Sequence, residues 1–186
     1  ANRLGIDPKD CPVWSLIIGL EGRTKRVEHN KDRLGKLLQK FACRQEDRLV
    51  APMTEQLDLP WMEASDYHTG FYALFSKMKG LEAEVDRAAK AAGLSPEKVG
   101  KIYTSFDYGR AVYAVYDWFS DDPAHRSAME ALNLSLADLG AFFDRSHGKL
   151  GRKIYTSIPN HLPVLKHIKK MLDPQNVMNP GRIIKD

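Results

Sequence analysis

Short apolar runs and amphipathic stretches alternate along the chain and predict a mixture of strands and helices. Residues 13–20 are an apolar, β-branched run between Pro12 and Gly22, which is typical of a strand. From Thr24 to Phe41, apolar residues recur near helical spacing among many charges. The first part of the chain is therefore predicted to be a strand followed by an amphipathic helix.

The middle of the chain predicts two helices and a hairpin. Residues 50–70 contain two prolines and predict an irregular connection, followed by helices over residues 71–78 and 81–92. Residues 101–107 and 110–119 carry aromatic and β-branched side chains with partial alternation. Because only Tyr108 and Gly109 separate them, they predict an antiparallel hairpin.

The last third predicts helices. One opens at Asp122-Pro123 and runs to about Asn133, and Ser135 caps another over residues 136–143. A third, over residues 162–172, stops before Pro174, because proline biases the preceding residue out of the helical region. The whole pattern predicts one α+β domain over residues 1–186, with an antiparallel sheet and helices packed on one side.

Composition narrows the function classes. The chain has 186 residues, 43% of them hydrophobic and 28% charged, and no apolar run reaches the ~20 residues of a membrane span. The net charge is +4, but the basic residues of the first helix are interleaved with Glu28 and Asp32, which favours a solvated helix face over a nucleic-acid site. Cys11 and Cys43 lack metal-ligand spacing, and reduced thiols fit a cytoplasmic protein.

Candidate chemistry gathers between residues 140 and 152. The sequence holds no phosphate-binding glycine loop, no His-x-x-x-His pair and no nucleophile elbow, so neither a nucleotide site nor a metal site is predicted in this chain. In the glycine-punctuated segment, Arg145 could clamp a carboxylate or a phenolate, and His147 could exchange a proton near neutral pH. A surface loop in which Arg145 pairs with Asp144 is the alternative.

The C-terminal tail carries two turn signals, Asp173-Pro174 and Asn179-Pro180-Gly181. They fit either a packed tail or a tail that docks onto a specific surface. The pair resembles the ending of the FAD-linked oxidases of the vanillyl-alcohol oxidase superfamily, which includes glycolate oxidase and D-lactate dehydrogenase. Gly140 and His147-Gly148 are similar to the hydroxyacid branch of that superfamily. Arg145 and His147 are similar to the phenol-oxidising branch, with Asp144 where that branch has a tyrosine.

The resemblance implies a ferredoxin-like, substrate-binding cap domain, inactive alone, of an FAD-dependent oxidoreductase. Its substrate would be a small hydroxy acid, an alcohol or a phenol, oxidised by hydride transfer to the flavin. The FAD would be held mainly by an N-terminal domain or a separate subunit absent from this chain. The implied residues are Arg145 and His147 for catalysis, Arg110, Tyr113 and Asp144 for substrate binding, and Asn179 and Gly181 near the cofactor. Residues 105–113 lack the metal-binding histidines of the hydroxyacid branch.

The partners expected on this basis are the FAD-binding domain or subunit and a small-molecule substrate, with no nucleic acid. A homo-oligomer stays open, and contact with a membrane would come only through partners. The alternative function is a non-redox module with a ferredoxin-like fold that binds a small molecule or forms oligomers, because a fold does not fix a function.

Overall fold

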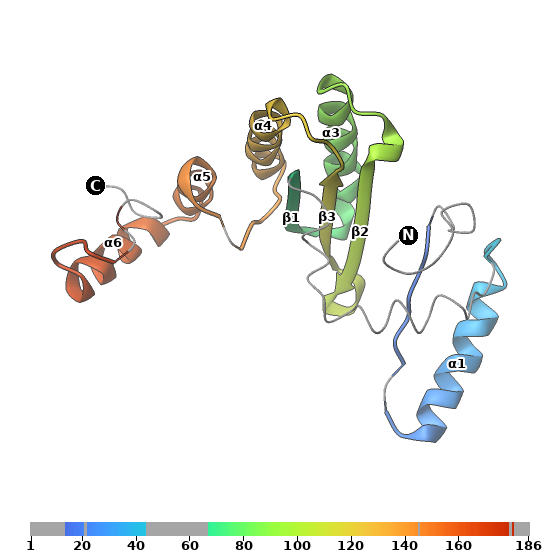
Figure 1. The fold of residues 1–186 in the computed structure, drawn as a ribbon. Coiled ribbons are helices and arrows are strands. Elements are labelled where there is room, and N and C mark those ends of the chain that lie inside the picture. The colour runs from blue at the N-terminus through green and yellow to red at the C-terminus, as the bar shows by residue number, and fades with distance from the viewer. Residues whose placement is uncertain (1–13, 21, 44–66, 145, 179, 181–186) are drawn as a thin grey trace. The chain divides into compact units, whose positions relative to one another are not determined.

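The computed structural model describes residues 14–20, 22–43, 67–144, 146–178 and 180 (Figure 1). By their internal contacts, residues 1–61 and 62–186 form two compact units, which we call unit 1 and unit 2. Each unit is described by itself. A single domain over residues 1–186 stays a prediction.

Unit 1 contains helix α1 (Thr24–Leu38), which confirms the predicted amphipathic helix although it ends three residues earlier. Residues 14–20, in contrast, form no strand. The apolar, β-branched composition of this segment favours extended backbone, but a strand also requires a hydrogen-bonded neighbour. Since no described residue pairs with the segment, the predicted strand is wrong for residues 14–20, and Val13 lies outside the described residues.

Unit 2 is built on an antiparallel sheet of strands β1 (Tyr67–Leu74), β2 (Val99–Phe106) and β3 (Ala111–Trp118), in the order β1–β3–β2. The β2–β3 hairpin was predicted correctly. Strand β1 was not, because residues 71–78 were assigned to a helix. Its side chains instead alternate with period two, with Phe71 and Ala73 buried and Leu74 exposed.

Four helices complete the described part of unit 2: α3 (Met78–Ala91), α4 (Ala124–Asp138), α5 (Gly148–Ser157) and α6 (His161–Leu172). Helices α3 and α6 match the predictions, whereas α5 was not predicted. The predicted break at Ser135 is wrong, because α4 continues through it. The Ser135 hydroxyl does not cap a new helix but donates a hydrogen bond to the Glu84 carboxylate of α3, at 2.5 Å.

The hydrophobic core lies between one face of the sheet and helices α3 and α4. Leu81 and Val85 of α3 and Leu132 and Leu136 of α4 pack with Phe71, Ala114, Tyr116 and Trp118 of the sheet. Helix α5 contacts α4, and α6 contacts α5, so the helical segment leads away from the core (Figure 1). This arrangement confirms an α+β fold with helices packed on the sheet.

Helix α4 ends in a hydrogen-bonded turn that is closed by a glycine. The backbone N–H of Ala141 donates to the carbonyl of Leu136, and that of Gly140 donates to the carbonyl of Ala137. Gly140 has a φ of 93°, so this is the glycine-terminated Schellman motif. Gly140 therefore ends α4.

Among the described residues, no helix combines the length and the apolar character needed to cross a membrane.

Candidate functional site

The face of the sheet opposite α3 and α4, here called the second face, carries a row of aromatic side chains. Strand register places Tyr72 beside Tyr113, and an isolated antiparallel bridge joins Tyr72 to Phe142 at the free edge of β1. The bridge is made by two backbone hydrogen bonds, of 2.7 and 2.8 Å. Phe106 lies at the end of β2. We call these four side chains, Tyr72, Phe106, Tyr113 and Phe142, the aromatic row.

The Tyr72 ring contacts two other rings of the aromatic row. The centroid of the Tyr72 ring lies 4.6 Å from that of the Tyr113 ring, with an angle of 39° between the ring planes. It lies 5.4 Å from the centroid of the Phe106 ring, which meets it edge-on. A Cβ atom built at Gly70 would lie only 2.6 Å from the Tyr113 hydroxyl oxygen, so the absence of a side chain at Gly70 makes room for this ring. Since contacting rings restrict one another, Tyr72, Phe106 and Tyr113 form a preorganised aromatic surface.

Only part of the second face is accessible. Val115 and Asp117 are buried, whereas Leu74, Phe106 and Phe142 are exposed. The exposed apolar side chains of this face therefore lie at the end near the β2–β3 turn, and the exposed His68 lies at the other end. A planar or apolar ligand could pack against the rings of the aromatic row, and the hydroxyl groups of Tyr72 and Tyr113 offer polar contacts within an apolar surface.

The β2–β3 turn holds the predicted residue Arg110 in a fixed position. Asp107, Tyr108 and Gly109 all have positive φ angles, of 49°, 56° and 81°. The Arg110 guanidinium forms an ion pair of 2.9 Å with the Asp107 carboxylate. The backbone carbonyl of Arg110 accepts a hydrogen bond from the Phe75 N–H. The charge of Arg110 is already paired, so an anionic ligand would have to compete with Asp107.

Asp144 follows α4 in the chain, two residues beyond Phe142 of the aromatic row, and its side chain is exposed. His147 is exposed at the position preceding α5, with extended backbone. The neighbouring Ser146 is buried, and its hydroxyl forms no hydrogen bond with any residue that the structure describes. Arg145 lies outside the described residues. The structure therefore locates Asp144 and His147 on one short segment but gives no contact between them and Arg110 or Tyr113.

The first turn of the tail is closed by Asp173. Its carboxylate accepts hydrogen bonds from the backbone N–H groups of Val177 (2.8 Å) and Met178 (2.9 Å) and from the Lys169 ammonium. The Lys169 hydrogen bond, followed by the two backbone ones, lowers the pKa of Asp173. This confirms the helix stop at Asp173-Pro174. The second predicted turn, with Asn179 and Gly181, falls outside the described residues apart from Pro180.

A polar network occupies the other, helix-covered face. Lys101 of β2 forms ion pairs of 2.9 Å with Glu82 and Asp86 of α3, and the hydroxyl groups of Tyr103 and Tyr116 lie 3.1 Å apart. Burial raises the pKa of Tyr116 to about 12, and burial followed by the hydrogen bond to Tyr116 raises that of Tyr103 as well. Neither phenol is suited to act as a base near neutral pH.

Comparison with protein-family models, curated proteins and solved structures found no match to this chain. No group of three or more His, Cys, Asp or Glu side chains within the described ranges could hold a metal ion. The aromatic row is therefore the candidate site. Sequence analysis found its Tyr113 but missed Tyr72, Phe106 and Phe142, although the alternation of residues 67–74 could have indicated the first of them.

Proposed function

We propose that this chain is the substrate-binding cap domain or subunit of an FAD-dependent oxidoreductase that oxidises a small hydroxy acid, alcohol or phenol. The observation that carries the proposal is the aromatic row on the second face, near the β2–β3 turn. A surface of paired rings beside exposed polar residues suits a cover for a flat substrate or cofactor ring. The resemblance of the tail and of the segment around His147 to the FAD-linked oxidases adds support.

The succession of elements in unit 2 supports a ferredoxin-like fold. That fold follows the order β-α-β-β-α-β. Here β1, α3, β2, β3 and α4 follow one another, and the chain then returns to the free edge of β1 at Phe142. A last strand reduced to a single bridge would complete the pattern. The free edge of β1 is thereby partly covered, and Phe142 joins the aromatic row.

The described residues fit the ring system of a flavin cofactor but not its pyrophosphate or adenine. The sequence has no glycine-rich phosphate loop, so the pyrophosphate and adenine would be held outside this chain. The aromatic row fits the flat ring system or the substrate that lies against it. When bound, the flavin would accept the hydride removed from the substrate. Asn179 and Gly181 are proposed to lie near the flavin domain.

The chain's own contribution would be orientation and charge. Tyr72 and Tyr113 would orient the substrate through ring contacts and hydroxyl hydrogen bonds. Arg110 would bind an anionic group by exchanging its partner Asp107, and Asp144 would limit which anions approach. Arg145 would stabilise developing negative charge, and the exposed His147 would accept a proton.

Co-purification tests the proposal. The full chain is expressed with the product of the adjacent coding sequence, and the visible flavin absorbance of the isolated material is measured. A yellow complex, together with a colourless chain on its own, is the expected result. A colourless chain that retains no flavoprotein would instead favour the non-redox binding or oligomerisation module.

Turnover of the complex then tests the site itself. Removing the Tyr113 hydroxyl with Tyr113→Phe should lower kcat/KM by roughly tenfold, the equivalent of about 1.4 kcal/mol of lost transition-state binding. The matched control is Tyr103→Phe, which removes a hydroxyl from the helix-covered face and should leave kcat/KM nearly unchanged. Equal effects of the two variants would contradict the assignment of the second face.

A further inference from the structure

The positive charge of the chain is concentrated in one segment of unit 1. Residues 23–40 contain seven lysines or arginines and two acidic residues, a net charge of +5, whereas the whole chain carries +4. The rest of the sequence is therefore slightly acidic. Such a concentration is a feature of surfaces that bind anions, provided the structure gives the charges a common side.

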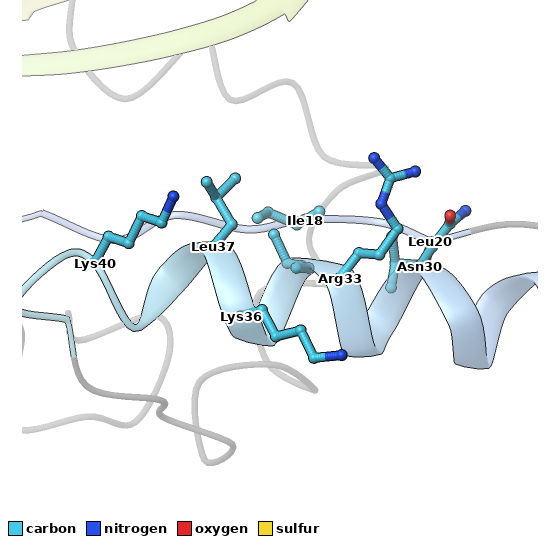
Figure 2. Close-up of a pocket in the computed structure, with 8 residues that line it drawn as sticks. Ile18, Leu20, Asn30, Arg33, Lys36, Leu37 and Lys40 are labelled. Carbon is cyan, nitrogen blue, oxygen red and sulfur yellow. The ribbon is translucent and has the colours of Figure 1, made fainter.

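Helix α1 and the extended residues 18–20 form an open groove of about 570 Å³ (Figure 2). Its apolar lining comes from Ile18, Leu20, Leu34 and Leu37, and its cationic lining from Arg33, Lys36 and Lys40. Arg33 and Lys36 belong to α1, and Lys40 lies two residues beyond its end. Arg33 and Lys40 extend to the same side as Leu37, whereas Lys36 points to the other side (Figure 2). Lys36 pairs with Asp32 at 2.8 Å, whereas neither Arg33 nor Lys40 has an ion-pair partner among the described residues.

Of the apolar side chains that line the groove, Ile18 and Leu37 are 42% and 51% exposed, whereas Leu20 and Leu34 are half-buried. Trp14 and Phe41, four residues before Ile18 and four after Leu37, are 60% and 63% exposed, and α1 has no buried residue. A helix of this length gains most of its stability from packing an apolar face. Unit 1 therefore presents a partly exposed apolar strip bordered by cations, two of which, Arg33 and Lys40, have no ion-pair partner among the described residues. We call it the basic groove: Ile18, Leu20, Arg33, Leu34, Lys36, Leu37 and Lys40.

We propose that the basic groove binds the surface of an anionic lipid bilayer. Charge decides between the possible occupants, because an apolar protein surface would leave Arg33 and Lys40 desolvated and unpaired. A bilayer interface supplies both needs at once: headgroup phosphates for the cations and the acyl boundary for Leu37 and Phe41. The exposed Trp14, four residues before Ile18 in the chain, suits the same interface, where indole rings concentrate.

Sedimentation with vesicles tests this directly. The full chain is mixed with vesicles of phosphatidylcholine alone, or with vesicles in which part of it is replaced by phosphatidylglycerol. Binding to the anionic vesicles only, weakening as salt is raised, is expected. Arg33→Glu with Lys40→Glu should weaken this binding by tenfold or more. Leu37→Asp, at an exposed position, should also weaken it, although it removes no cation.

The matched control is Lys79→Glu with Lys90→Glu. It makes the same change in net charge at exposed positions of α3 and should leave vesicle binding unchanged. Equal loss in both double variants would reduce the effect to net charge and overturn the proposal. So would equal binding to neutral vesicles, or a dimer in solution that Leu37→Asp dissociates while no vesicle binding is seen. None of these measurements depends on a flavin.

Discussion

Gly70→Ala is the sharpest test of how the aromatic row is held together. Gly70 lies within β1, and its φ is not among the positive values, so alanine meets no backbone strain there. The new Cβ atom would, however, lie 2.6 Å from the Tyr113 hydroxyl oxygen and 3.2 Å from its Cζ atom. The Tyr113 ring must move, and because the Tyr72 ring contacts it, the Tyr72 ring must adjust as well.

The expected cost follows from two opposing effects. Overpacking of this kind costs about 1–3 kcal/mol. Alanine in a strand regains about 0.5–1 kcal/mol relative to glycine, because it restricts the unfolded chain. We therefore expect Gly70→Ala to lower the free energy of unfolding by about 1 kcal/mol, and by no more than about 2.5 kcal/mol, measured by urea denaturation of the full chain.

A second background isolates the contact. In a Tyr113→Ala chain the obstructing ring is gone, so adding Gly70→Ala should be neutral or stabilise the fold by about 0.5 kcal/mol. Tyr113→Phe, which removes only the hydroxyl, should give an intermediate result. A Gly70→Ala penalty of the same size in the wild-type and Tyr113→Ala backgrounds would refute the proposed steric link between the two residues.

Three further predictions concern the polar contacts. Hydrogen bonds from Arg87 and Ser135 lower the pKa of Glu84 to about 2. The contribution of Glu84 to stability is therefore present above about pH 4.5 and is lost as the pH falls toward 2. Ser135→Ala should shift acid unfolding to higher pH. Asp173→Asn should speed amide hydrogen exchange of the Val177 N–H roughly tenfold, and an unchanged rate would argue against the turn. His125→Ala should cost about 2 kcal/mol in urea, because its ring hydrogen-bonds the Ala92 carbonyl at 2.9 Å; no measurable cost would contradict this.

Local patterns predicted the elements whose contacts are close in sequence. Leu81, Val85 and Ala89 recur every four residues and are all buried, so the periodicity of α3 was visible in one short window. The hairpin was equally local, because only residues 107–110 join its two strands. Helix α4 was divided wrongly at Ser135, since the partner of that hydroxyl, Glu84, lies 51 residues away in the sequence.

Helix α5 shows why a locally unfavourable sequence can still be helical. Gly148 and Gly151 both lower helix propensity, which led to the prediction of a glycine-punctuated loop. In the structure a Cβ atom at Gly151 would lie 3.0 Å from the carbonyl oxygen of Ser146. The glycine is therefore favoured by a close approach of the backbone, which only the folded chain reveals.

The candidate site was the least accessible to sequence reasoning. Tyr113 was predicted as a substrate-binding residue, but none of its neighbours in the row was. Its neighbours come from strand pairing and from the bridge between Tyr72 and Phe142, which joins residues 70 positions apart. A register of this kind is set by tertiary packing rather than by local composition.

The two faces of the sheet differ in what their tyrosines can do. On the helix-covered face, burial raises the hydroxyl pKa of Tyr116 to about 12, and Tyr103 shares its hydrogen bond, so both phenols stay neutral and serve the fold. On the second face, Tyr72 and Tyr113 lie in a row whose ends, Phe106 and Phe142, are exposed. Ligand chemistry in unit 2 is therefore expected on the second face, because Tyr72 and Tyr113 lie there in one row with the exposed Phe106 and Phe142. A ligand-induced shift confined to Tyr103 and Tyr116 in an NMR titration would contradict that division.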